Sequence, residues 1–330
     1  MTWLVTGGAG YIGAHVVRAL CRSGREVVVL DDLSTGIAGK IPVSVPVVEA
    51  SVMNADALTA TIERYCVEGV VHLAAKKAVE ESVQRPLWYY EENVEGFRRL
   101  LNAMMRADVQ RLVLSSSAAV YGMADVDLVR EDQPCVPVNP YGQTKLVCEW
   151  LAAAAAEAHG LQPVLLRYFN VAGAGASELG DPGVTNLIPL VLRALVAGEA
   201  PLVFGHDYPT QDGTCVRDFI HVEDLAEAHV VAALALQADR TGTATYNVSR
   251  GIGYSVREVI EVAQRVTGIE TEPRMASRRA GDPARVVGSA DAMRDALGWN
   301  AIHGLEDMVA SDWEARKHCS QVMPSATAIG

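Results

Sequence analysis

The residues best suited to chemistry are Tyr141 and Lys145, which lie four positions apart. Pro140 suits the first turn of a helix, and the Ala-, Leu- and Glu-rich run at 146–158 predicts that helix. The spacing places both side chains on one helical face, one turn apart. There the Lys145 ammonium can favour a Tyr141 phenolate, which accepts protons near neutral pH. The pair predicts proton transfer, although ordinary helices also carry this spacing by chance.

Three consecutive hydroxyl residues, Ser115, Ser116 and Ser117, follow the apolar run 111–114, which predicts a strand. Ligands of open parallel sheets bind at the carboxyl ends of the strands. We therefore expect one of these serines to lie beside the acid–base pair of the next helix. The alternative is a loop in which the serines only cap local structure.

A Gly-rich turn stands near the start of the chain, between a predicted strand at 4–5 and a predicted helix at 14–23. Its glycines allow a tight turn and let backbone N–H groups approach a pyrophosphate at the positive end of the helix. A second predicted strand, 26–30, ends at Asp31, about 20 residues after the glycines, where a carboxylate can accept ribose hydroxyls. No Arg or Lys lies between Asp31 and Gly39, which favours NAD over NADP.

The alternation of strands and helices continues along the chain. Strands are predicted at 70–74, 111–114 and 163–168, and a helix is predicted at 94–106. Right-handed crossovers between such strands build a parallel sheet. We therefore predict an α/β protein with a Rossmann-type doubly wound parallel sheet and a smaller mixed α/β substrate-binding domain.

The composition bounds the class of protein. The chain has 330 residues, half of them hydrophobic, which is enough for a large core or two domains. Its formal net charge of -12 argues against nucleic-acid binding, which relies on clustered Lys and Arg. The sequence shows no secretory signal and no apolar run long enough to cross a membrane, so we expect a soluble, cytoplasmic protein. The six scattered cysteines lack the spacing of a disulfide framework or zinc site, so no metal is expected.

Seven motifs, spread over nearly the whole chain, carry a family resemblance. They are GGAGYIG (7–13), DDLSTG (31–36), KAVEES (77–82), SSSAAVYG (115–122), YGQTK (141–145), LRYFNVAGA (166–174) and DYPTQDGTCVRDFIHVEDLA (207–226). On these motifs the chain resembles the extended short-chain dehydrogenase/reductase family, and within it the UDP-glucose (UDP-galactose) 4-epimerases. The first and fifth motifs are shared by the superfamily, whereas the third and seventh are more particular to the 4-epimerases.

The resemblance implies an NAD-dependent isomerase of UDP-hexoses. Tyr141 would take the proton of the sugar 4-hydroxyl while a hydride passes from C4 to the nicotinamide. Lys145 would lower the pKa of Tyr141 and bind the nicotinamide ribose, and Ser117 would hydrogen-bond the reacting oxygen. The 4-keto sugar would turn over and take the hydride back on its other face, so NAD would stay tightly bound. The resemblance also implies a homodimer formed through the Ala-rich helix.

The resemblance assigns binding residues as well. For NAD it implies Gly7, Gly10, Tyr11, Ile12, Gly13, Asp31, Asp32, Ser34, Thr35, Gly36, Ser51, Val52, Leu73, Ala74, Ala75, Lys77, Asn93, Tyr141, Lys145 and Tyr168. For the UDP-hexose it implies Lys77, Ser117, Tyr141, Asn170, Asn186, Leu187, Phe204, Arg217, Arg279 and Asp282. Arg217 and Arg279 suit a pyrophosphate, because a guanidinium offers forked donors to phosphate oxygens. The alternatives are a solvated charge beside Arg278 for Arg279, and a salt bridge with Asp218 or Glu223 for Arg217.

The resemblance also implies a division of the chain into an NAD-binding Rossmann domain, a UDP-sugar-binding domain and a loose tail. The expected boundaries are 1–170 with about 214–237 for the first, 171–213 with 238–315 for the second, and 316–330 for the tail. His72 and His221 each end an apolar strand, so we expect hydrogen-bonded structural histidines at both positions.

Related enzymes with the same Tyr and Lys catalyse other reactions. Dehydratases that resemble this chain carry an acidic pair after the strand-end hydroxyl, where this sequence has Ala118 and Ala119. Without a local acid, epimerisation is the chemistry that remains. A net oxidoreductase or another epimerase of a related nucleotide sugar stays open as an alternative. A non-catalytic NAD sensor also stays open, although such proteins commonly lose the Tyr or the Lys.

Three positions depart from the family pattern. Ser51 stands where an Asp usually contacts adenine, and Ala75 and Glu80 replace commonly small or Gly positions near the cofactor and in the KAVEES turn. Val286, of middling size, occupies the position at which a bulky side chain closes the sugar pocket against N-acetyl groups. We therefore expect partial acceptance of UDP-N-acetylhexosamines.

Overall fold

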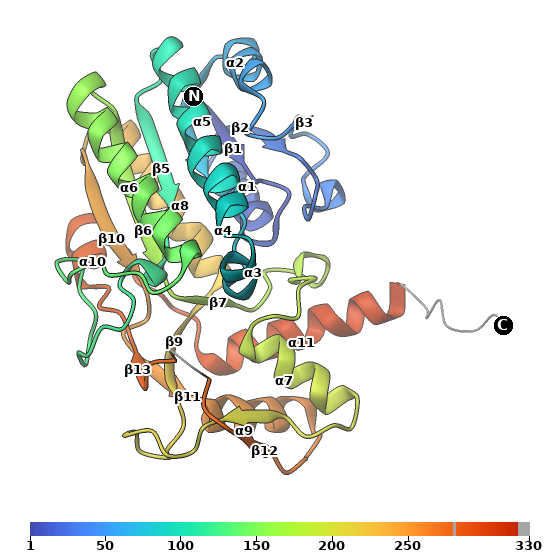
Figure 1. Cartoon of the computed structure of the whole chain (residues 1–330). Helices are drawn as coiled ribbons and strands as arrows, with labels where there is room; N and C mark the ends of the chain where they lie inside the picture. The colour runs from blue at the N-terminus through green and yellow to red at the C-terminus, as the bar shows by residue number, and fades with distance from the viewer. Residues whose placement is uncertain (280–281, 323–330) are drawn as a thin grey trace.

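A computed structural model describes residues 1–279 and 282–322. Its largest element is a seven-stranded sheet with the order β10-β6-β5-β4-β1-β2-β3 (Figure 1). The strands are β1 Thr2–Thr6, β2 Glu26–Asp31, β3 Val47–Glu49, β4 Val67–His72, β5 Arg111–Ser115, β6 Gln162–Tyr168 and β10 Ala244–Val248. Every neighbouring pair is parallel, as predicted. The strand order reverses at β1, so the carboxyl ends of β1 and β4 flank the expected ligand crevice.

Helices cover both faces of this sheet. One face packs against α1 Tyr11–Arg22 and α8 Val222–Gln237. The other face packs against α2 Ala55–Arg64, α5 Gly96–Arg106 and α6 Pro140–His159. Helices α5 and α6 lie in front of the sheet in Figure 1. Alternate strand residues serve the two cores: Trp3 and Val5 join the α1 side, and Leu4 joins the α5 side. Because both faces are buried, the strands are almost continuously apolar.

A smaller unit lies below the sheet in Figure 1. Its helices are α7 Leu187–Val196, α9 Val256–Thr267 and α11 Leu305–Val322, and its strands are β7 Asn170–Ala172, β8 Leu202–Phe204, β9 Val216–His221, β11 Gly253–Ser255, β12 Arg274–Ala276 and β13 Arg285–Val286. Leu192, Phe219, Ile260 and Met308 share one buried cluster there. Since β11 runs antiparallel to β9 while β13 runs parallel to it, this part has the predicted mixed α/β character.

Short elements complete the chain. They are α3 Val79–Gln84, α4 Pro86–Tyr89, α10 Asp291–Leu297, η1 Ala38–Lys40, η2 Tyr90–Glu95, η3 Ala118–Val120 and η4 Ser177–Leu179. No helix among the described residues is long and apolar enough to cross a membrane.

Three of the predicted boundaries differ from the structure. The stretch at about 214–237 is predicted for the NAD-binding domain, but its strand β9 pairs with β7, β11 and β13 in the smaller unit. Residues 238–315 were assigned entirely to the smaller domain, but β10 pairs with β6 in the large sheet and α10 packs against β10. The predicted tail is wrong for 316–322, which continue α11, while 323–330 lie outside the described residues. The last turns of α11 are held by contacts that a weak hydrophobic pattern does not reveal, among them the ion pair between Arg316 and the buried Asp312.

Candidate active site

The helix that carries the acid–base pair begins where the sequence predicts. The Asn139 side chain caps α6 by accepting a hydrogen bond from Gly142 N at 2.9 Å, and Pro140 occupies the first turn. Gly142 faces the end of η3, and a Cβ there would lie 2.6 Å from Ala119 O. The missing side chain therefore lets α6 approach the segment that follows β5.

Tyr141 and Lys145 are both buried, with 8% and 4% of their surfaces exposed. Lys145 Nζ donates a hydrogen bond to Ser115 O at 2.9 Å. Burial raises the pKa of the Tyr141 phenol, while a hydrogen bond with Ser117 acts in the opposite direction. Burial lowers the pKa of the Lys145 ammonium. Burial is the largest influence on the pKa of both groups, and the Lys145 ammonium is turned towards Ser115 O.

The three serines have separate partners. Ser115 Oγ lies 2.8 Å from His229 Nε2, and Ser116 Oγ donates to a carboxylate oxygen of Glu149. Ser117 is the serine beside Tyr141, and it also caps η3 by accepting a hydrogen bond from Ala119 N at 3.2 Å. The predicted catalytic position and the alternative capping role thus fall on the same residue.

The Gly-rich turn forms a close-packed cradle at the start of α1. Gly7 has a φ of 72°, and a Cβ there would lie 2.6 Å from Ala74 N. Gly10 caps α1 without a side-chain hydrogen bond, so no side chain covers the first backbone N–H groups of the helix. A pyrophosphate fits this combination of a glycine cradle and an uncapped helix N-terminus.

The carboxylate at the end of β2 is held in place. Asp31 is 7% exposed, and it accepts hydrogen bonds from Ala9 N and Leu33 N, both at 2.9 Å. Burial is the main reason that its pKa is raised. The neighbouring Asp32 accepts from the hydroxyl and backbone N–H of Ser34 at 2.6 and 3.0 Å. The two acids therefore fix the turn that follows β2, next to the glycine cradle.

Other predicted cofactor residues lie after the strands of the large sheet or in contact with such segments. Ser51 follows β3 and accepts a hydrogen bond from Met53 N at 3.1 Å. Asn93 is buried and holds the segment after β4, because its side chain accepts from Lys76 N at 2.7 Å and donates to Lys76 O at 3.0 Å. Tyr168 ends β6, and burial raises its pKa. Tyr11 instead uses its hydroxyl to donate to Gly173 O. The remaining predicted positions are Ile12, Gly13, Thr35, Gly36, Val52, Leu73, Ala74 and Ala75.

The predicted substrate residues meet in pairs. Arg217 and Asp282, which are 65 positions apart, form an ion pair, so the proposed salt bridges of Arg217 with Asp218 or Glu223 are wrong. The Arg279 guanidinium lies 4.0 Å from the centre of the Phe204 ring. Lys77 Nζ lies 3.9 Å from Asp181 Oδ2. The pairs of Arg217 with Asp282 and of Arg279 with Phe204 each join two predicted substrate residues, whereas Asp181, the partner of Lys77, was not predicted.

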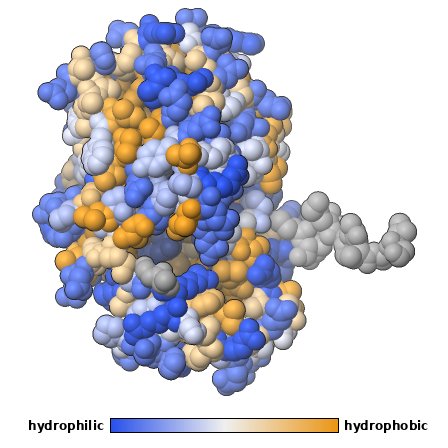
Figure 2. Space-filling view, in the orientation of Figure 1, coloured by the Kyte–Doolittle hydropathy of each residue, from blue (hydrophilic) through white to orange (hydrophobic). Residues whose placement is uncertain are grey.

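The other predicted substrate residues lie in a hydrogen bond or at the start of a helix. Asn170 donates to Asp218 O at 2.9 Å, while Asn186 and Leu187 form the start of α7. Arg278, the neighbour of Arg279, pairs instead with Asp207 at 2.7 Å in an exposed ion pair. The face shown in Figure 2 is hollowed between the part that holds the large sheet and the part that holds α7 and α9.

Both predicted structural histidines are hydrogen-bonded. His72 Nδ1 lies 2.7 Å from Thr6 Oγ1. His221 accepts from Glu223 N at 3.1 Å, and its other ring nitrogen lies 3.1 Å from Ser311 Oγ. His221, Glu223 and His303 also lie close enough together to hold a metal ion, but both nitrogens of His221 are already engaged.

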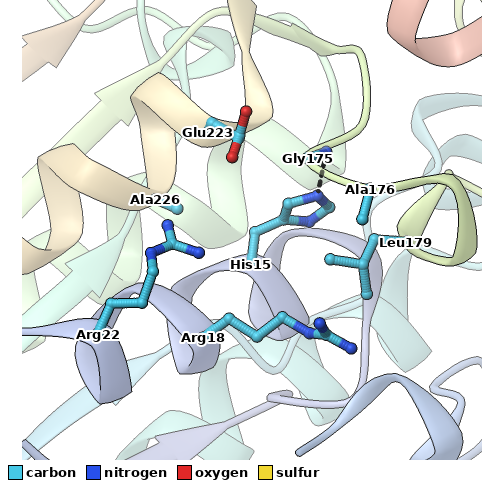
Figure 3. A pocket seen from close by; sticks show the side chains of 8 residues that line it. All are labelled: His15, Arg18, Arg22, Gly175, Ala176, Leu179, Glu223 and Ala226. Atoms are coloured by element: carbon cyan, nitrogen blue, oxygen red, sulfur yellow. Dashed lines mark hydrogen bonds between the residues drawn. The ribbon is translucent and has the colours of Figure 1, made fainter.

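A cavity of about 60 Å³ lies away from the predicted site, between α1, α8 and the loop around η4 (Figure 3). His15 occupies its wall and accepts a hydrogen bond from Gly175 N at 2.9 Å. Arg18 and Arg22 from α1 and Glu223 from α8 also line it. None of the predicted site residues lines this cavity.

Two residues at the site escaped prediction. Lys76 Nζ lies 3.3 Å from Ser34 Oγ, whereas the family pattern drew attention to its neighbour Lys77. Glu149 contacts Ser116 from the same helix as Tyr141 and Lys145. Its spacing of four residues after Lys145 was the available signal, since it continues the same helical face.

The described residues form an α/β fold in which a glycine-rich turn opens α1, and the buried Tyr141 and Lys145 lie at the carboxyl ends of the strands of a parallel sheet. The profile of the NAD dependent epimerase/dehydratase family matches residues 3–249. The chain belongs to this family.

Several known proteins resemble the chain over nearly its full length. A UDP-glucose 4-epimerase of Azospirillum brasilense is 45% identical over 318 residues, which cover 94% of this chain and 91% of the relative. A crystal structure shows a UDP-glucose 4-epimerase from Stenotrophomonas maltophila with bound NAD and formylated UDP-arabinopyranose. That protein is 40% identical to this chain, and the two structures superpose with a TM-score of 0.94. The match covers 98% of this chain and 100% of that chain. The UDP-Glc/GlcNAc 4-epimerase of Campylobacter jejuni is 35% identical with a TM-score of 0.86, covering 96% and 99%.

Proposed function

We propose that the chain is a UDP-glucose 4-epimerase that interconverts UDP-galactose and UDP-glucose with tightly bound NAD. The observation that carries the proposal is the buried pair Tyr141 and Lys145 with Ser117 beside it, set at the same carboxyl ends of the sheet as the glycine cradle. The relatives that match over nearly their full length are UDP-glucose 4-epimerases, which supports the same conclusion.

Each residue of this group has a role in the reaction. Tyr141 accepts the proton of the sugar 4-hydroxyl and later returns a proton to the 4-keto oxygen. Ser117 orients that oxygen beside the phenol. Lys145 supplies the positive charge, and its hydrogen bond to Ser115 O keeps the ammonium in the site. When bound, NAD supplies reversible hydride transfer at C4.

The same residues serve both half-reactions. After the 4-keto sugar turns over, Tyr141 protonates the oxygen when the hydride returns to the opposite face. The net change in redox state is zero, so the glycine cradle and Asp31 need not release the dinucleotide between turnovers. The proposed holders of NAD are the cradle for the pyrophosphate and Asp31 for the adenosine ribose.

The local sequence favours this outcome over elimination of water. Ala118 and Ala119 form η3 directly after Ser117, where an acid would be needed to protonate a leaving hydroxyl. A net oxidoreductase acting on a related nucleotide sugar is the second candidate. It would change the amount of NADH in proportion to the substrate consumed.

For the UDP portion we propose the paired residues of the smaller unit. Arg217 and Arg279 would bind the diphosphate, and Asp282 would bind the uridine ribose hydroxyls. Arg217 and Asp282 form an ion pair with each other, which sets their two side chains side by side. Phe204 supports Arg279 through its ring.

Substrate breadth forms a further part of the proposal. Val286 lies in β13 directly beside Arg217 of β9, and its size leaves room that a bulky residue would fill. We expect slower conversion of UDP-N-acetylgalactosamine than of UDP-galactose. The Campylobacter jejuni relative is a UDP-Glc/GlcNAc 4-epimerase, which supports this expectation. If UDP-galactose is converted and UDP-N-acetylgalactosamine is untouched, this part fails.

We propose a cytoplasmic homodimer formed through α6. Trp150 projects from α6 with 62% of its surface exposed, which suits burial by a second copy. The uncrosslinked cysteines of the described chain suit a reducing compartment. Light scattering gives the oligomeric state; a monomer at micromolar concentration contradicts the dimer.

The activity itself is tested by incubating the purified protein with UDP-galactose and no added cofactor. Proton NMR of the anomeric signals should show UDP-glucose, while the absorbance of NADH stays constant. Stoichiometric NADH formation would support the oxidoreductase instead. No conversion with or without added NAD would contradict the proposed activity.

A further inference from the structure

One face of α6 meets all three serines that follow β5. Lys145 Nζ donates to Ser115 O at 2.9 Å, and Ser117 lies beside Tyr141. One turn beyond Lys145, the Glu149 carboxylate accepts the hydrogen bond of Ser116 Oγ. Three side chains at successive helical turns are therefore matched to three successive residues of the strand end.

Glu149 is also fixed from the opposite side by Arg167 of β6. Arg167 Nε lies 2.9 Å from Glu149 Oε1, and Arg167 Nη2 lies 2.6 Å from Glu149 Oε2. The two side chains are only 9% and 5% exposed. A two-pronged ion pair of this kind fixes both distance and orientation. Glu149 thus ties α6 to the ends of two neighbouring strands, β5 and β6.

Arg167 is itself held firmly. Arg167 Nη1 donates to the Tyr121 hydroxyl oxygen at 3.0 Å, and the Tyr121 hydroxyl donates to Asn247 Oδ1 at 2.7 Å. Asn247 belongs to β10, the next strand of the sheet. The network therefore runs from the edge strand to α6 through buried, hydrogen-bonded groups, and a movement of α6 along β5 would break several contacts at once.

Stability alone does not explain such a pair well. Two buried charges lose most of their hydration, and buried ion pairs can often be replaced by apolar residues at little cost in stability. Geometric precision is the more specific gain, because a misplacement of about 1 Å in a catalytic group can lower a rate by roughly 100-fold.

We propose that Glu149 is a positioning residue for epimerisation: through Ser116 and Arg167 it holds the α6 face that carries Tyr141 and Lys145 in register with the end of β5. It acts through these neighbours and does not contact the substrate. The inference rests on the proposed epimerase function.

Three variants of the full chain test this role. Glu149→Met with Arg167→Met removes both charges together and so avoids a buried unpaired ion. Ser116→Ala is milder, removing only the hydroxyl that Glu149 holds, and it remains informative if the double variant does not fold. Ser289→Ala is the matched control, since Ser289 is also buried and donates to a carboxylate, that of Asp291 at 2.8 Å, in a different part of the chain.

The measurements are kcat, KM, bound NAD, melting temperature and the primary isotope effect with UDP-galactose deuterated at C4. We expect kcat to fall about 100-fold in the double variant and about tenfold in Ser116→Ala, with KM and NAD content unchanged. The isotope effect should rise in both, because misplacement slows the hydride step. Ser289→Ala should keep the wild-type kcat and isotope effect.

A structural role alone gives a different result. Lower melting temperatures with unchanged kcat per folded molecule and an unchanged isotope effect would overturn the inference, as would a change confined to KM or NAD content. Inactive wild-type protein would instead overturn the proposed function, and the inference with it. Active wild-type protein with fully active variants overturns the inference alone.

Discussion

The catalytic pair and the residues proposed to bind the UDP portion are built in opposite ways. Tyr141 and Lys145 come from one helix and are buried, and Lys145 donates a hydrogen bond to a neighbouring strand end. Arg217 and Asp282 come from distant segments, retain 17% and 30% side-chain exposure, and form an ion pair. The difference indicates that one helix sets the geometry of the proposed catalytic pair, whereas the geometry of the proposed binding residues depends on contacts between distant segments.

The largest expected effect is the loss of Tyr141. Tyr141→Phe removes the proton acceptor and should lower kcat by about 10² to 10⁴-fold, while NAD content and melting temperature stay close to wild type. Tyr246→Phe is the control, because Tyr246 is equally buried in β10 but outside the site. Undiminished epimerisation by the Tyr141 variant would remove this residue from its role.

The binding region should respond in KM instead. Arg217→Met removes a proposed diphosphate contact and should raise KM roughly 10- to 100-fold with a much smaller change in kcat. Arg278→Met should leave both parameters near wild type, since Arg278 makes an exposed ion pair with Asp207. A fall in kcat with constant KM in the Arg217 variant would erase the contrast between the two regions.

Pocket size is expected to have a smaller, selective effect. Val286→Tyr should lower kcat/KM for UDP-N-acetylgalactosamine about tenfold or more. A change in the size of one pocket side chain typically alters the preference between two substrates by about this factor. Conversion of UDP-galactose should change little, which a direct comparison of the two substrates measures. Equal losses on both substrates would indicate a general disturbance of β13 rather than control of breadth.

The buried side of the site should make the fold sensitive to acid. His229 is fully buried behind Ser115, and burial lowers its pKa from 6.5 to about 4. The unfolded chain then binds a proton that the folded chain does not, so stability is lost as the pH falls from about 6.5 towards 4. The contribution is on the order of 1 kcal/mol per pH unit.

Denaturant unfolding at several pH values measures this slope. His229→Gln should flatten it between pH 6.5 and 4, whereas His159→Gln, at the exposed end of α6, should leave it unchanged. An identical slope in the His229 variant and the wild type would contradict the assignment.

Local patterns predicted much of this molecule. The parallel sheet, the glycine cradle and the start of α6 follow from strand periodicity, glycine spacing and an Asn–Pro cap, all of which act within a few residues. The sequence did not predict that β10 belongs to the large sheet. This strand has only five residues, too few for a clear hydrophobic pattern, and it follows a long stretch of chain that lies mostly in the smaller unit.

The partners of the site residues were harder to predict than their positions. The pairing of Arg217 with Asp282 joins segments 65 residues apart, so neighbouring acids looked equally suitable. The contact of Lys145 with Ser115 O depends on how closely α6 approaches β5, which Gly142 permits at its first turn. Such choices depend on tertiary packing and not on the local pattern.

The most direct test of the central claim follows the hydrogen at C4. UDP-galactose deuterated at C4 is incubated with the purified protein without added NAD, and the UDP-glucose formed is examined by NMR and mass spectrometry. Removal and return of the same hydride within one buried site predicts that deuterium is retained at C4 of the product. Replacement of the deuterium by solvent hydrogen would contradict the account.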